Sequence, residues 1–160
     1  MKIRLLVIIF LACNISAFSQ ENTFSLDNKF AAGLGLEFNL DSRNYFAGGF
    51  VLAFDYNLNS NYSVGANLTA SNNFDGFIVV EPTVMVRHYI WENCHSQIFF
   101  IQVDLGALFF REDGEWTPMF EIGLRGGFRM PIRTIYYIEP YGRLGYPFAY
   151  GIGIIVGRLF

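Results

Sequence analysis

The sequence predicts an all-β protein, a single barrel of eight antiparallel up-and-down strands that spans a membrane. Large apolar residues alternate with small or polar ones at period two, the pattern of strands whose two faces meet different surroundings. The chain is 52% hydrophobic with 16 glycines and only two lysines, so it carries fewer charges than a water-exposed surface. No apolar run reaches the roughly 18 residues that a membrane helix needs. A membrane protein of this kind must therefore close its strands into a barrel.

Residues 1–19 are expected to form a secretory signal peptide. Lys2 and Arg4 supply its charged start, residues 5–12 are apolar, and small residues precede the expected cleavage after Ser19. The alternative is a lipoprotein signal with Cys13 as the lipidated residue. Both alternatives predict export and assign residues 20–160 to the barrel. After cleavage Cys94 is the only cysteine left, so we expect no internal disulfide.

The first half of the exported chain contains four alternating segments. Residues 28–40 and 45–58 place phenylalanine and leucine at every second position, with glycine, alanine and acidic residues between them. Polar turn residues separate these segments from each other and from the third, residues 62–71. The fourth, residues 77–91, places valine and isoleucine on one row and a mixed row with Glu81 and Arg87 opposite. Pro82 lies inside it and cannot donate a ladder hydrogen bond, so we expect a bulge or a missing bond there.

The second half contains the other four segments. Residues 98–110 and 119–130 alternate in the same way, and the stretch 111–118 between them is predicted to be the longest loop. Residues 134–145 form the seventh segment, which Pro140 interrupts. The closing strand runs to Phe160 and sets a large apolar face against one that is mostly glycine and alanine.

The bulky face is predicted to point outward into lipid. An eight-stranded barrel has an interior that side chains only just fill. The bulky face carries Phe30, Phe38, Phe46, Phe50, Phe54, Phe99, Phe109, Phe120 and Phe128. This set is too large for such a lumen, whereas the opposite face is small with a few charges. Aromatic rims are then expected at the membrane interfaces, with Tyr56, Tyr62 and Tyr136 on one side and Tyr146, Tyr150 and Trp116 on the other.

Charges on the inner face must be paired, because an isolated buried charge is costly. If the turn 131–133 sets the register, Arg125 lies opposite Glu139, and Glu121 lies opposite Arg143. A four-residue turn at 94–97 would place Arg87 opposite Asp104, and an eight-residue loop would place Asp104 opposite Arg125. The predicted result is a belt of charges across four strands, Arg87, Asp104, Arg125 and Glu139. The belt either rigidifies and plugs the lumen or acts as an ion gate.

Other candidate sites are weak. Cys94 and His95 lack the further ligands of a zinc site, and His88 belongs to the lipid-facing row. The acidic stretch with Glu112, Asp113 and Glu115 is expected to be a solvated outer tip. We expect no catalytic residue, cofactor or metal. The exported part has nine basic and 14 acidic residues and no basic run, so nucleic-acid binding is excluded.

The closing strand resembles that of bacterial outer-membrane β-barrels. It ends on an aromatic residue, Phe160, with apolar or aromatic residues at alternate positions before it, although Arg158 departs from the usual apolar third-last residue. With the signal, the alternation and the turn spacing, the chain is similar to the OmpA/OmpX-type class. The resemblance implies an outer-membrane location, contact with membrane lipid, recognition of Phe160 by the barrel-assembly machinery, and a monomer.

The same resemblance implies three roles. The first is a non-enzymatic barrel with a plugged polar lumen and a structural or surface-interaction role. The second is a narrow pore for small or apolar molecules, as in OmpW-like barrels. The third is an adhesin, which the short predicted outer loops disfavour.

Overall fold

The computed structural model describes residues 29–40, 46–73, 78–93, 97–112, 114–132, 135–147 and 150–160, without the side chains of residues 91–93, 97 and 112. The predicted signal peptide, Cys13, Cys94 and His95 lie outside the described residues. The described residues form eight strands, β1 (Phe30–Leu40), β2 (Phe46–Asn57), β3 (Tyr62–Asn72), β4 (Ile78–Asn93), β5 (Gln97–Glu112), β6 (Glu115–Pro131), β7 (Tyr136–Tyr146) and β8 (Tyr150–Leu159).

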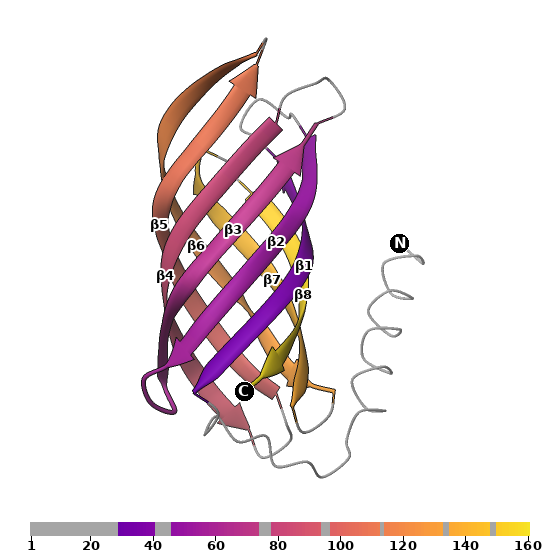
Figure 1. Cartoon of the computed structure of the whole chain (residues 1–160). Coiled ribbons are helices and arrows are strands. Elements are labelled where there is room, and N and C mark those ends of the chain that lie inside the picture. Colours follow the sequence, from indigo (N-terminus) through magenta and orange to yellow (C-terminus); the bar gives the residue numbers. More distant parts are fainter. Residues whose placement is uncertain are drawn as a thin grey trace, which may run out of the picture.

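The strands form a closed barrel in which each strand pairs antiparallel with its sequence neighbour, and β8 pairs with β1 (Figure 1). The last residue takes part in the closure, because the Phe160 N–H donates to the Phe30 carbonyl at 2.8 Å. The predicted eight-stranded up-and-down barrel is confirmed. No helix among the described residues is long and apolar enough to cross a membrane.

The barrel is strongly staggered. Paired residues followed once around the wall from Phe30 do not return to Phe30 but arrive ten residues further along β1, at Leu40. The ring contains Phe30, Tyr56, Val64, Val86, Val103, Leu124, Leu144, Tyr150 and Leu40. Such a stagger tilts the strands against the barrel axis, as Figure 1 shows, and fixes the radius of the interior.

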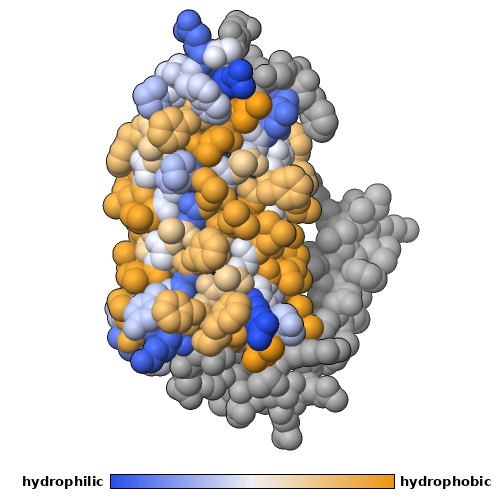
Figure 2. Space-filling model, viewed as in Figure 1, coloured by the Kyte–Doolittle hydropathy of each residue, from blue (hydrophilic) through white to orange (hydrophobic). Residues whose placement is uncertain are grey.

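The bulky residues point outward, as predicted. Phe50 and Val84 each expose 64% of their surface and Phe120 exposes 63%. The charged residues inside the barrel are buried, and they are Glu37, Asp55, Glu81, Arg87, Asp104, Glu121, Arg125, Arg129, Glu139 and Arg143. Figure 2 shows an apolar band across the visible face of the wall, with hydrophilic residues at both ends. The expected tyrosines and Trp116 lie exposed at the strand ends. This arrangement matches a hydrocarbon layer between two wet interfaces.

Pro82 and Pro140 lie inside strands, and each interrupts one ladder of backbone hydrogen bonds, as expected. Pro82 pairs with Leu68 of β3, but the pairing of β4 with β5 stops between Val80 and Thr83. Pro140 pairs with β8, and the pairing of β7 with β6 has a gap beside it.

The predicted loop 111–118 is wrong. β5 and β6 continue through it as a long hairpin, in which Glu112 pairs with Glu115. Gly114 has a φ of 90°, which a glycine adopts without steric cost, so the chain can reverse tightly there. The hairpin extends beyond the other strands at the end opposite the C-terminus (Figure 1).

Candidate functional site: an ion-paired lumen

Glycines of one strand make room for large polar side chains of the neighbouring strand. An added Cβ at Gly157 would collide with the ring of Tyr137, and one at Gly153 with the ring of Tyr141. The glycines of β8 therefore allow two buried tyrosines of β7 to lie across the lumen. Apolar side chains, including Phe100, Ile155 and Leu159, fill the space near the end that carries the C-terminus.

The first group of charges, here the lower cluster, consists of Asp55, Arg87, Arg129 and Glu139. Arg87 contacts Asp55 at 3.2 Å through Nη1 and Glu139 at 2.9 Å through Nη2. Arg129 contacts Glu139 at 2.7 Å through Nε and also pairs with Asp55. Each guanidinium therefore binds both carboxylates, and the four charges balance. Because Arg87 on β4 and Glu139 on β7 belong to strands that are not neighbours, their ion pair crosses the lumen.

Aromatic and amide groups complete the lower cluster. The Arg87 guanidinium lies 4.1 Å from the centroid of the Phe100 ring, and its Nε donates to Gln102 Oε1 at 2.9 Å. The Arg129 guanidinium lies 4.3 Å from the Tyr137 ring centroid. Buried cations over aromatic faces gain attraction that a wet site would screen. These contacts hold both arginines in one position.

The second group of charges, here called the upper cluster, lies nearer the barrel end that carries the β5–β6 hairpin. β4 and β6 begin at that end, and they contribute residues near their starts to this cluster. Arg143 contacts Glu37 at 2.7 Å and Glu81 at 2.6 Å, and it also pairs with Glu121. Arg125 lies 3.4 Å from Glu37 through Nη1, and its Nε lies 2.9 Å from Asp104 Oδ2. The upper cluster thus sets four carboxylates against two guanidinium groups. Unlike the lower cluster it has two more carboxyl groups than guanidinium groups.

Several buried oxygen atoms of the upper cluster have no hydrogen-bond donor. They are Glu81 Oε1, Glu121 Oε2, Asn67 Oδ1, Thr69 Oγ1 and Thr83 Oγ1. Four of them gather where β3 meets β4, because Thr69 pairs with Glu81 and Asn67 pairs with Thr83. Buried acceptors of this kind normally bind a donor, ordered water or an ion.

The predicted belt residues are all buried in the lumen, but the predicted registers are wrong. Arg125 lies opposite Arg143 and Gln102, rather than opposite Glu139 and Asp104. Arg87 lies opposite Gln102, so Asp104 is displaced by two residues. The actual turns cause the shifts, because the β5–β6 hairpin is tighter than expected and the register of β4 with β5 changes between Tyr89 and Trp91.

Ion pairs form diagonally and across the lumen, so the single belt becomes two clusters. Arg125 still pairs with Asp104, and Arg143 still pairs with Glu121. Glu37, Asp55, Glu81 and Arg129 also belong to the two clusters, and the predicted belt did not include them. The signal that could have found them was their strand parity combined with charge.

Sites outside the lumen give little chemistry. Within the described residues, no three histidine, cysteine or carboxylate side chains are grouped to hold a metal ion. His88 Nδ1 lies 3.1 Å from the Asn61 carbonyl, and its ring stacks on Tyr62. At the chain end the Arg158 guanidinium lies 4.9 Å from the Phe160 ring centroid, and both residues are exposed on the outer surface.

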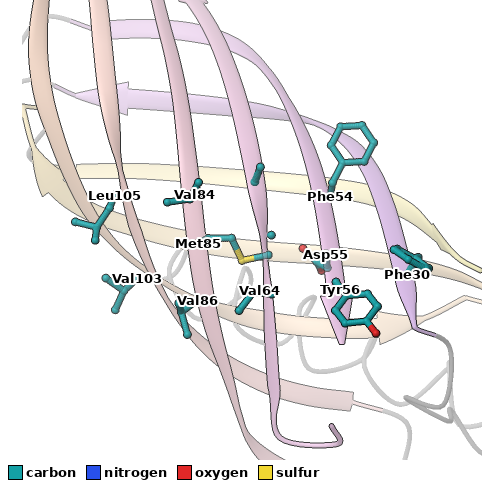
Figure 3. Close-up of a pocket in the computed structure, with 12 residues that line it drawn as sticks. Phe30, Phe54, Asp55, Tyr56, Val64, Val84, Met85, Val86, Val103 and Leu105 are labelled. Carbon is teal, nitrogen blue, oxygen red and sulfur yellow. The ribbon is translucent and has the colours of Figure 1, made fainter. Parts of the chain in front are cut away.

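The outer wall has an apolar hollow of about 630 Å³ over β3. Its lining includes Val64 and Ala66 of β3. The side chains of Phe54, Val84 and Leu105, from the strands on either side, also line it (Figure 3). In a bilayer such a surface contacts acyl chains.

Comparisons with known proteins identify the fold. No family model matches the chain, and no curated protein matches it significantly. The structure is similar to Neisserial surface protein A, with a TM-score of 0.68 at 9% identity over 82% of this chain and 96% of that one. It is similar to the N-terminal β-barrel domain of Pseudomonas aeruginosa OprF, with a TM-score of 0.59 at 11% identity over 81% of this chain and 97% of that one.

A de novo designed transmembrane β-barrel also matches, with a TM-score of 0.56 at 8% identity over 86% of this chain and 100% of the design. The matches show that the chain has the fold of small outer-membrane β-barrels, and its apolar outer wall suits a barrel that spans a membrane. Because a designed chain shares the fold, the fold by itself does not specify a role.

Proposed function

We propose that this outer-membrane barrel is non-enzymatic and that its lumen is plugged by ion pairs, so that it serves a structural or surface-interaction role. The supporting observation is the lower cluster. Arg87 and Arg129 each bind both Asp55 and Glu139 from strands on different sides of the lumen. An interior of eight strands is only just large enough for its side chains, and these four residues occupy its width.

The surface-interaction part of the proposal concerns the end with the β5–β6 hairpin. The other strand connections at that end span only residues 41–45, 73–77 and 147–149, so they offer little surface for an adhesin. The β5–β6 hairpin extends beyond the other strands (Figure 1) and presents exposed Glu115 and Trp116. It is the part of the described chain best placed to meet a partner outside the cell.

A narrow pore is the second candidate, and one observation favours it. The inner face of β3 carries Ser63, Thr69 and Ser71, whose buried hydroxyl groups have no hydrogen-bond partner. Water alongside these groups would form a thin polar path beside the ion pairs. A plugged lumen is favoured over a pore, because the lower cluster and Phe100 lie at the end of this path.

Conductance of refolded protein in planar bilayers tests the proposal. Wild type is expected to pass negligible current. The charge-balanced double variant Arg87→Ala with Glu139→Ala should conduct, because it removes one pair that crosses the lumen and leaves Arg129 with Asp55. The matched control, Arg158→Ala with Glu115→Ala, removes one basic and one acidic side chain from the exposed surface and should stay silent. Steady wild-type current equal to that of the lumen variant would establish the pore instead.

Assembly is a separate part of the proposal. We infer that Phe160 is the residue that the barrel-assembly machinery recognises, which its exposed ring at the barrel edge supports. Deleting Phe160 is expected to lower the amount of folded protein in the outer membrane, while the purified variant still refolds in detergent. Equal amounts of the variant and wild type in the membrane would contradict this role.

A further inference from the structure

We propose that the upper cluster binds a small monovalent cation, Na⁺ or K⁺, between Glu81, Glu121 and the β3 wall. This inference goes beyond the plugged lumen and does not depend on whether the barrel conducts. The first observation behind it is the charge of the upper cluster. Glu37, Glu81, Asp104 and Glu121 share only two guanidinium groups, those of Arg125 and Arg143.

The other described basic side chains do not supply the missing charge. Lys29, Arg111 and Arg158 are exposed, and His88 is half-buried on the outward row of β4. The carboxylates of the upper cluster are at most 1% exposed, so water cannot screen them freely. A buried charge excess of this kind is costly unless a counter-charge enters the site.

The unpartnered atoms show where the counter-charge belongs. Glu81 uses Oε2 and Glu121 uses Oε1 to bind Arg143, which leaves Glu81 Oε1 and Glu121 Oε2 without a donor. Thr69 lies opposite Glu81 and is 1% exposed, and its hydroxyl has no partner.

Thr83 and Asn67 extend this set. They face each other across β3 and β4 one pair further along, are 4% and 3% exposed, and each has an unpartnered oxygen, Thr83 Oγ1 and Asn67 Oδ1. The Asn67 amide nitrogen is already used, because it donates to Asp104 Oδ1 at 2.9 Å. At Glu81, Glu121, Thr69, Thr83 and Asn67 the atoms without a hydrogen-bond partner are therefore all oxygens, although Arg125 Nε and Arg143 Nε are also without one.

The chemistry of these ligands selects the kind of cation. Carboxylate, hydroxyl and amide oxygens are hard ligands that suit Na⁺, K⁺, Mg²⁺ and Ca²⁺. Ca²⁺ takes about 6–8 oxygen ligands and Mg²⁺ keeps several of its waters, which a tightly filled lumen does not accommodate. In addition, no three carboxylates of the described chain are grouped to hold a metal ion. Two carboxylates that share the unpaired negative charge, together with neutral oxygens, fit a monovalent ion.

The experiment measures ²³Na⁺ binding to refolded wild type in detergent micelles by line broadening of the sodium NMR signal. We expect saturable broadening that K⁺ displaces and choline does not. Glu81→Gln with Glu121→Gln keeps the side-chain shapes and removes the charge excess, and it should weaken Na⁺ affinity by at least about tenfold. Thr69→Val with Thr83→Val keeps every charge and should weaken binding severalfold if the hydroxyl groups are ligands.

Glu115→Gln is the matched control, because it removes one carboxylate from an exposed position and should bind Na⁺ like wild type. Wild type alone can overturn the proposal. No broadening, together with an infrared carbonyl band of a protonated carboxyl that Glu121→Gln abolishes, would show that a proton supplies the charge. No broadening and no such band would show water alone. Equal binding by the two-glutamine variant and wild type would place the ion elsewhere.

Discussion

Glu139 is the carboxylate whose loss should expose most clearly how the lumen is stabilised. It accepts from Arg87 Nη1 at 3.0 Å, from Arg87 Nη2 at 2.9 Å and from Arg129 Nε at 2.7 Å. The substitution Glu139→Gln keeps its size but leaves two buried guanidinium groups with one carboxylate, Asp55. Breaking a buried ion pair from one side costs roughly 3–5 kcal/mol. We expect the free energy of unfolding to fall by that amount.

Urea unfolding of the protein in phospholipid vesicles, followed by tryptophan fluorescence, measures this change. Glu115→Gln makes the same chemical change at an exposed position and should alter the free energy of unfolding by at most about 0.5 kcal/mol. The double variant with Arg129→Gln should cost less than the two single changes together, by roughly 0.5–3 kcal/mol, because the residues share one network. A loss below about 1 kcal/mol for Glu139→Gln, as for a surface pair, would refute the reasoning.

Three further predictions test the packing, the register and the outer face. Gly157→Val should lower the free energy of unfolding by about 1–3 kcal/mol, because the new side chain meets the Tyr137 ring. Gly126→Val, on the roomier outer face, should be tolerated. The midpoints of urea unfolding compare the two variants. Gly126→Cys with Gly142→Cys, in a Cys94→Ser background, should form a disulfide detectable by mass spectrometry, because these residues are direct partners; the register expected from the turn 131–133 would keep them apart. Val84→Arg should cost roughly 2–4 kcal/mol in vesicles if Val84 lies near the bilayer midplane, and a neutral result would contradict a lipid-facing wall.

Most of the fold could be predicted from the alternation of large and small residues along the strands. Parity alone determines which residues are inside, so Arg87, Asp104 and Glu139 could be assigned to the lumen without any knowledge of partners. The number of strands followed from turn residues between periodic segments. The tight reversal at Gly114 was missed because the acidic and aromatic residues around it resemble a loop, although they pair as strand.

The ion-pair partners could not be predicted by the same reasoning. Register depends on the number of residues in each turn, and an error of two residues moves every partner along the strand. A second reason is that long arginine side chains reach across the lumen to strands that are not neighbours, as Arg129 of β6 reaches Asp55 of β2. Cross-strand reasoning considers only adjacent strands, so it found one belt where the structure has two clusters.

The most direct measurement compares two single-tryptophan proteins in vesicles whose acyl chains carry bromine. After Trp91→Phe and Trp116→Phe, one protein receives Phe50→Trp on the exposed outer row and the other Phe100→Trp on the buried inner row. Bromine should quench the fluorescence at position 50 strongly and leave position 100 nearly unchanged. Quenching at position 100 with none at position 50 would mean that the bulky residues face the interior, and it would contradict the membrane-spanning, ion-filled barrel.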